Sequence, residues 1–407
     1  MREDPVTTAE RVVMVADHPR VMQDWNEENA IRLARMFGIE YEVELTPTRN
    51  GLARVTQGKP FPTESRYRPF SSLREWYTVV TGDENINHWG QRVRQILSLT
   101  SAEDMLANVA NRILIEDFAP TDYRWKDVVT SITGPPDFRQ NVRGRLQYIP
   151  DIPTLTEDQL YPEIQGVTAD NQEITYSMTQ QGGMLSFTRR AIINDDIGLI
   201  QRAIKQVGRA CWRTLAKRVW NMFITNATFG EDGLPLFCAQ HGNLGTAVLS
   251  ESDAAASVAA LNAARAAIFS QTEPGGTDLL GLGAGPLFLA VPIQLEPVAT
   301  ALNLSPFFID SENVWSANPW RHRFGKENEN IFVNPLFTDA GAWYMFDVSG
   351  KVQIAEVGFL QGRQEPHLIQ SGPLTETEFY QDRVTYKVEH DFACVPLDYR
   401  GAYKSGT

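Results

Sequence analysis

The run Cys238-Ala-Gln-His241 comes closest in this sequence to a nucleophile or a metal motif. A cysteine nucleophile needs a base and an orienting group, and Asn243 stands near enough to serve as the second. A structural zinc site needs four ligands, usually two such pairs. The other cysteines, Cys211 and Cys394, are isolated. The spacing therefore favours a turn at residues 241–243 whose side chains bond backbone groups.

No other group of residues in the sequence supports catalysis or cofactor binding. His322, His367 and His390 are scattered, without the spacing of a metalloprotease helix. The glycine run 281–285 precedes a predicted strand instead of joining a strand to a helix, so it does not fit a dinucleotide loop. Neither a phosphate-binding P-loop nor a GxSxG elbow occurs. We expect no catalytic residue, no metal and no cofactor, and we expect the protein not to be an enzyme.

The composition indicates a folded, acidic protein. A chain of 407 residues suggests two or three domains. Hydrophobic residues at 43% and aromatic residues at 10% suffice for a core. The net charge of −13 argues against nucleic-acid binding through a basic face. Three widely separated cysteines form no disulfide framework and are expected to be free thiols in a reducing compartment.

The sequence also lacks membrane signals. Residues 1–10 are polar and charged, unlike a signal peptide. The longest apolar run, Pro286–Pro292, is too short to cross a bilayer. We expect no membrane partner, and synthesis in the cytoplasm.

The element that must position everything else is a long helix predicted over residues 195–225. Its apolar residues recur in steps of three or four, which makes one stripe. We expect the final strand and the helix at 252–270 to cover this stripe, and Arg202, Lys205 and Arg209 on the polar side to meet solvent or a neighbouring subunit. The residues of the stripe are Ile197, Ile200, Ile204, Val207, Cys211, Leu215, Val219 and Met222.

A long β-hairpin is predicted just before this helix. Residues 142–149 alternate between polar and apolar, and residues 150–173 are rich in proline and acidic side chains. Residues 174–188 then give two β-type runs broken by Gly182-Gly183. A long hairpin that cannot bury itself on its own domain often lies on a neighbour. An ordinary mobile surface loop is the alternative.

The remaining pattern alternates helices and short strands. We expect helices near 25–37, 101–117, 252–270 and 294–303. We expect strands at 41–45, 287–291, 331–334, 343–347 and 353–357, and one strand over 382–395.

The order of these segments resembles the major capsid proteins of tailed phages, in particular Mu-like major head subunits and those encoded as protease–capsid fusions. The most specific runs are Ser186–Ile197 and the stretch from Leu236-Phe237 through His241-Gly242-Asn243. Residues 72–83 and 101–124 also look like the start of the capsid region. The likeness covers roughly residues 70–407, more weakly at 280–380. The protease half of the fusions is missing from residues 1–66.

The resemblance implies an α+β chain with the Hong Kong 97-type capsid fold: a long spine helix, an extended β-hairpin loop, a P domain, an A domain and an N-terminal leader. Its implied boundaries are 1–97 for a leader or scaffold-like extension, 98–148 for an N-terminal arm and 149–185 for the extended loop. The P domain would span 186–279, with spine helix 195–225, the A domain 280–375, and the return strand of the P domain 376–407.

The resemblance also implies a function and partners. The chain would be a virion protein, assembled in the host cytoplasm into pentamers and hexamers that enclose double-stranded DNA. Its partners would be further copies of itself, a portal, a separate maturation protease and a decoration protein, with packaged DNA contacted weakly and non-specifically. The expected inter-subunit contact residues are Glu157, Asp158, Tyr161, Glu163, Arg189, Arg190, Arg202 and Arg209.

Two other functions stay open at this stage. An encapsulin-like compartment would share the fold but carry enzyme cargo; such shells usually lack a long leader. A cysteine hydrolase would use Cys238 and His241.

Overall fold

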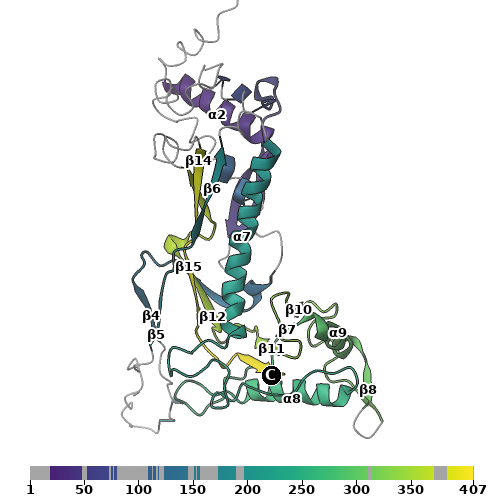
Figure 1. Ribbon diagram of the computed structural model, residues 1–407. Coiled ribbons are helices and arrows are strands. Elements are labelled where there is room, and N and C mark those ends of the chain that lie inside the picture. The colour runs from purple at the N-terminus through teal and green to yellow at the C-terminus, as the bar shows by residue number, and fades with distance from the viewer. Residues whose placement is uncertain are drawn as a thin grey trace, which may run out of the picture. The chain divides into compact units, whose positions relative to one another are not determined.

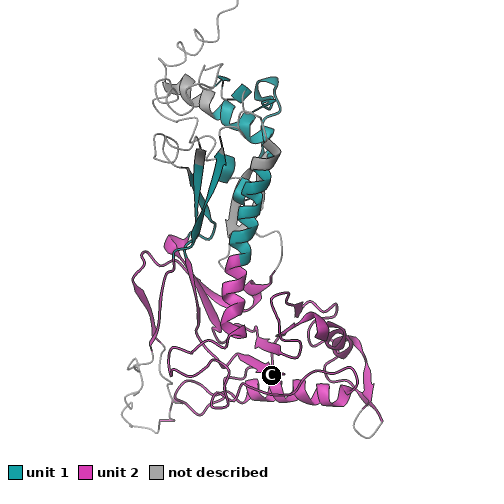
Figure 2. Cartoon of the chain, in the orientation of Figure 1, with its two compact units in different colours: residues 1–121, 180–213, 363–391 teal, residues 122–179, 214–362, 392–407 magenta. Residues whose placement is uncertain are grey.

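The computed structural model describes most of the chain, and its described part divides into two compact units (Figure 2). The first unit combines residues 1–121, 180–213 and 363–391, and the second combines 122–179, 214–362 and 392–407. Helices and strands mix within each unit, which confirms the α+β class. The described residues are 19–47, 53–72, 75–76, 78–79, 109–111, 113–115, 118, 123–144, 151–152, 154–155, 173–188, 197–309, 314–370 and 383–406.

The predicted long helix is confirmed as α7, Ile197–Ile224 (Figure 1). Residues 197–213 belong to the first unit and residues 214–224 to the second. Along the predicted stripe, Ile204, Leu215, Val219 and Met222 are buried, while Val207 and Cys211 are partly buried. The stripe therefore contributes apolar side chains to both units.

The first unit packs helices against an antiparallel sheet. Helix α2 (Pro19–Met36) precedes the hairpin of β1 (Tyr41–Pro47) and β2 (Ala53–Pro60), and the 3-10 helix η1 spans Ser65–Tyr67. The sheet has the order β13 (His367–Gln370), β14 (Arg383–Glu389), β6 (Gly182–Thr188). Its inward side chains share one hydrophobic cluster with α2 and the first half of α7. Coverage of the stripe by the final strand is thus confirmed for β14.

A four-stranded sheet forms the centre of the second unit (Figure 1). Its order is β10 (Ile331–Val333), β7 (Leu287–Val291), β11 (Trp343–Asp347), β16 (Ala402–Ser405), and only the β10–β7 pair is parallel. Strands β7 and β11 are buried along their whole length. Such runs are typical of strands covered on both faces.

Different elements cover the two faces of this sheet. Leu287, Leu289 and Met345 share a cluster with helices α8 (Ala254–Phe269) and α9 (Glu296–Leu304). Phe332 stacks on Trp220 in the second half of α7, and Phe346 contacts Trp220 and Phe223 edge-on. Phe288 packs against Phe332 and Phe346. Helix α8 therefore packs on the face of the sheet that carries Leu287, Leu289 and Met345, in a cluster that contains no residue of α7. The prediction that residues 252–270 cover the α7 stripe is wrong.

The second unit also holds a smaller sheet and two hairpins. The smaller sheet has the order β15 (Phe392–Pro396), β12 (Ala355–Phe359), β3 (Val129–Thr133). The predicted long hairpin is confirmed at its base, where β4 (Gln140–Gly144) pairs antiparallel with β5 (Glu173–Ser177). A second hairpin pairs β8 (Phe307–Ile309) with β9 (Trp315–Ala317). The second unit also contains three short 3-10 helices: η2 (Trp125–Asp127), η3 (Ile293–Leu295) and η4 (Leu360–Gly362).

Two boundaries differ from the sequence-based expectation. The single strand predicted over 382–395 is two strands, β14 and β15, which belong to different sheets and are separated by His390 and Asp391. Gly182 and Gly183 are the first residues of β6 and do not interrupt a strand. Glycine is needed at position 182 because a Cβ there would lie 2.5 Å from the carbonyl oxygen of Val388 on β14. Among the described residues, no helix is long and apolar enough to cross a membrane.

We predict that the aromatic contacts of Trp220 dominate the stability of the second unit. The side chain is 0% exposed, its ring centroid lies within 6.2 Å of those of four phenylalanine rings, and its indole N–H donates to the carbonyl oxygen of Tyr123 at 2.9 Å. Trp220→Ala should lower the free energy of unfolding by about 3–5 kcal/mol in urea titrations. The matched control is Trp315→Ala, where the side chain is 71% exposed, with an expected change of about 0.5 kcal/mol or less. Equal losses in the two variants would contradict this assignment.

We also predict acid sensitivity at His390. Burial lowers the pKa of this histidine from its ordinary 6.5 to about 4. The unfolded chain then binds more protons than the folded one between pH 6.5 and 4, so stability falls as the pH falls through that window, by about 3 kcal/mol. Urea titrations at pH 7 and pH 4 should show this loss. The variant His390→Gln, which keeps a donor for the carbonyl oxygen of Gln364, should show a loss smaller by about that amount. An identical pH dependence in both proteins would refute it.

Candidate functional site

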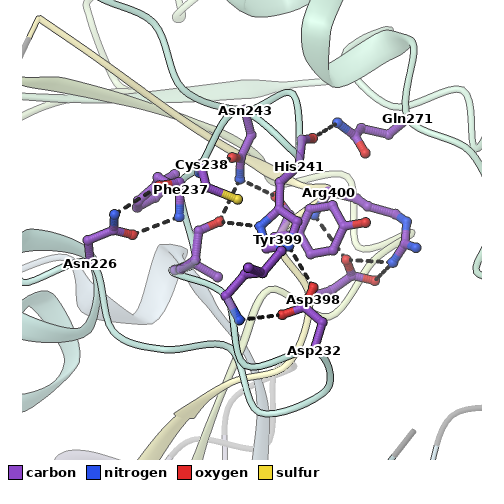
Figure 3. Close-up of polar contacts among 12 residues, drawn as sticks. Asn226, Asp232, Phe237, Cys238, His241, Asn243, Gln271, Asp398, Tyr399 and Arg400 are labelled. Atoms are coloured by element: carbon purple, nitrogen blue, oxygen red, sulfur yellow. Dashed lines mark hydrogen bonds and ion pairs between the residues drawn. The ribbon is translucent and has the colours of Figure 1, made fainter.

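The Cys238–His241 segment lies in a loop that is fastened to the end of α7 (Figure 3). Asn226, just beyond the helix, has a left-handed backbone (φ 53°). Its side-chain amide donates to the carbonyl oxygen of Phe237 at 2.9 Å and accepts from the Phe237 N–H at 2.7 Å. Asparagine tolerates the left-handed conformation better than other non-glycine residues. These two hydrogen bonds hold the loop against the end of α7.

His241 is buried, and both of its ring nitrogens have partners (Figure 3). Nδ1 lies 3.0 Å from the carbonyl oxygen of Leu236, and Nε2 lies 2.7 Å from the Asp232 carboxylate. The ring stacks on Tyr399 at a centroid distance of 3.7 Å and an angle of 6°. Phe229 meets the ring edge-on at a centroid distance of 6.0 Å. The imidazole is thus held by four neighbours, none of which is Cys238.

Asn243 fastens the same loop from the other side. Its side-chain oxygen accepts from the Cys238 N–H at 3.1 Å, and its amide nitrogen donates to the carbonyl oxygens of Leu236 and Tyr399 at 2.9 and 3.3 Å. The Asn243 carbonyl also accepts from the Lys404 N–H of β16 at 3.0 Å. These contacts confirm the predicted turn, whose side chains bond backbone groups.

This geometry does not support cysteine catalysis. A thiol nucleophile needs a base within hydrogen-bond reach, whereas the ring nitrogens of His241 are held by Leu236 and Asp232. The other thiols are poor nucleophiles because burial raises the pKa of Cys211 to about 11 and that of Cys394 to about 12. Within the described ranges, no group of three or more histidine, cysteine or acidic side chains is arranged to hold a metal ion.

The predicted inter-subunit residues fall largely outside the structure's described part. Glu157, Asp158, Tyr161, Glu163, Arg189 and Arg190 all lie in ranges it does not describe. Arg202 and Arg209 are exposed on α7, and Lys205 beside them is half-buried. The structure therefore places two of the eight residues, and their role as contacts stays a prediction.

An exposed apolar surface on the β8–β9 hairpin was missed from the sequence. Phe307, Ile309 and Trp315 are 56%, 46% and 71% exposed. Phe308 points the other way and packs in the core with α8. The apolar residues Phe307-Phe308-Ile309 were the available signal, but three apolar residues in a row do not show which side chains will be exposed.

We predict that Asn243 supports the turn and that the Cys238 thiol is dispensable. Asn243→Ala would leave the buried Cys238 N–H without its acceptor and should cost about 2–3 kcal/mol of unfolding free energy. Cys238→Ala removes only a small buried sulfur and should cost about 1 kcal/mol. Urea titration of both variants gives the comparison. A Cys238→Ala variant that kept its stability but lost a thiol-dependent hydrolysis would revive the catalytic alternative.

Residues 171–405 match the family model described as phage capsid protein. No curated protein matches the sequence. Similar solved structures include the procapsid of bacteriophage JBD30, at 14% identity and TM-score 0.38, with 75% of this chain and 76% of that one covered. A virus-like particle from Pyrococcus furiosus has 10% identity and TM-score 0.42, with 73% and 97% covered. For Mycobacterium phage Cain the values are 14% and 0.39, with 72% and 87% covered. Since the family match spans more than half of the 407 residues, the chain belongs to the phage capsid protein family.

Proposed function

We propose that this chain is the structural subunit of an icosahedral phage head. It assembles into pentamers and hexamers that close around double-stranded DNA, and it has the Hong Kong 97-type capsid fold. The observation that carries the proposal is the capsid-family match over residues 171–405, which includes α7 and the whole four-stranded sheet of the second unit. The work of such a protein is done by surfaces between copies, and no catalytic role is assigned.

The hairpin of β4 and β5 supports this function as a contact between subunits. A two-stranded hairpin is marginally stable by itself in water. One of its faces is buried, through Ile174 and Tyr176, while Val142 and Thr175, paired opposite each other, are exposed on the other face. In this proposal residues 149–185 form the extended loop, and this loop lies across a neighbouring copy. Its contact residues are Glu157, Asp158, Tyr161 and Glu163.

The other parts follow the same assignment. Residues 98–148 act as the N-terminal arm and 186–279 as the P domain around α7. Residues 280–375 form the A domain, and 376–407 form the return to the P domain. Residues 1–97 form a leader or extension, processed or retained. A portal, a separate protease and a decoration protein complete the head, and the acidic chain contacts packaged DNA weakly.

We predict that the purified full-length chain forms closed particles, visible by negative-stain electron microscopy and as a fast-sedimenting species. Charge reversal at the proposed contacts, in the double variant Arg202→Glu and Arg209→Glu, should lower the particle yield by about tenfold or more, because opposed like charges weaken an interface. Lys217→Glu alters another exposed cation of the same helix that is not among the proposed contacts. It serves as the matched control and should assemble normally.

Two results would count against the proposal. A wild-type chain that stays a compact monomer at high concentration would contradict shell formation. Equal particle yields for the wild type and the double variant, with unchanged thermal stability, would remove Arg202 and Arg209 from the interface.

A further inference from the structure

The most densely bonded buried charge described in the second unit is the carboxylate of Glu356, which lies beneath the β4–β5 hairpin. Glu356 is on β12 and is 1% exposed. Its Oε2 accepts from the Ser131 hydroxyl at 3.0 Å, and its Oε1 accepts from the Thr133 hydroxyl at 3.0 Å. Both of these residues lie on β3, the parallel neighbour of β12.

The remaining donors come from the hairpin itself. Arg143 of β4 donates through its Nε at 3.0 Å and a terminal nitrogen at 2.9 Å, both to Oε1. Tyr176 of β5 donates its hydroxyl to the same oxygen at 2.6 Å. One buried carboxylate thus joins both hairpin strands to the three-stranded sheet. Charge-assisted bonds of this kind are about twice as strong as neutral ones.

The local sequence makes room for this contact. Gly358, two residues further along β12, lies on the same side of the strand as Glu356. A Cβ at this position would lie 3.1 Å from the Tyr176 hydroxyl oxygen and 3.2 Å from its ring. The absence of a side chain lets the tyrosine reach the carboxylate.

The other contacts at this end of the hairpin are buried apolar side chains, Ile174 and Met178, and one backbone bond. The backbone N–H of Thr179, just past β5, donates to the carbonyl oxygen of Phe392 at 3.3 Å. The outer face of the hairpin is exposed at Val142 and Thr175. Since a detached two-stranded hairpin is marginal, its order depends on the inner face, and the strongest contacts there converge on Glu356.

We propose that Glu356 is the positioning residue of the extended loop: it fixes the base of the β4–β5 hairpin on the β15-β12-β3 sheet and so sets the direction in which the loop leaves the subunit. The part concerning the loop as a contact on a neighbouring copy rests on the proposed function. The part concerning the base of the hairpin rests on the bonds within one chain.

Hydrogen exchange of the full-length chain tests the inference. Glu356→Gln keeps the side-chain size but removes the charge, which should raise the exchange rates of amides in β4 and β5 by about 10- to 100-fold. Ser131→Ala removes one neutral partner of the same carboxylate and leaves its charge and its bonds to the hairpin in place, so it should raise those rates far less than Glu356→Gln does. Gly358→Ala displaces the Tyr176 ring without changing any charge and should raise them. Amides of β7 and β11 report whether the fold as a whole is intact, and Tyr176→Phe is the milder variant if Glu356→Gln fails to fold.

Each readout separates one claim. Unchanged hairpin exchange in Glu356→Gln, with β7 and β11 still protected, would overturn the role of Glu356. Faster hairpin exchange together with a normal yield of closed particles would overturn the link to assembly. If the wild-type chain forms no particles at all, the proposed function fails, while the exchange experiment still decides whether Glu356 holds the hairpin.

Discussion

The apolar stripe of α7 is the constraint on which the rest of the described structure depends. Of the stripe residues, Ile204 belongs to the core of the first unit, and Leu215, Val219 and Met222 are buried in the second. Trp220 and Phe223, outside the stripe, join the aromatic layer of the second unit. A helix can serve two cores in this way only if the three- and four-residue spacing continues without a proline or glycine break along the stripe. Gly208 lies within the helix but does not interrupt the stripe. Substitutions along this stripe are therefore expected to destabilise both units.

Helix α7 and the central strands could be predicted because their apolar residues recur at regular spacing. Prediction failed where the sequence pattern does not show which face of an element is buried or which element covers it. Helix α8 is rich in alanine, so little in its periodicity shows which face will be buried or against what. In residues 382–395 alternation is clear only as far as Val388; three polar residues, 389–391, and an apolar run, 392–395, follow, but this change of pattern does not by itself show that the second strand joins another sheet. The break is a matter of tertiary structure: His390 is buried against Phe118, and Phe392 pairs with Phe359 in another sheet.

The candidate site shows the same division. Residue types and spacing were enough to expect a polar turn at 241–243, because short side chains next to glycine bond nearby backbone groups. They could not show that Asp232 and Tyr399 hold His241, since Tyr399 is distant in the sequence. The hydrogen bonds to Glu356 could not be predicted for the same reason, because the donors come from residues 131, 133, 143 and 176, far away in the sequence. Of the predicted contact residues, only Arg202 and Arg209 can be placed, and their role remains a prediction.

The described polar and apolar groups divide the work of the second unit in a way that suits assembly. Buried polar side chains fix loops in place: Glu356 holds the hairpin base, Asn243 bonds the backbone of Cys238 and Tyr399, and Asp347 accepts from the backbone of Gly283 and Ser349. Each such group requires its partners at fixed positions, since an unpaired buried group is costly. The loops are thereby given defined directions before any second copy arrives. Exposed apolar side chains, such as Phe307 and Trp315, have no comparable directional demand and can be buried by a partner of suitable shape. A subunit built in this way presents preorganised surfaces, which reduces the ordering cost when copies associate.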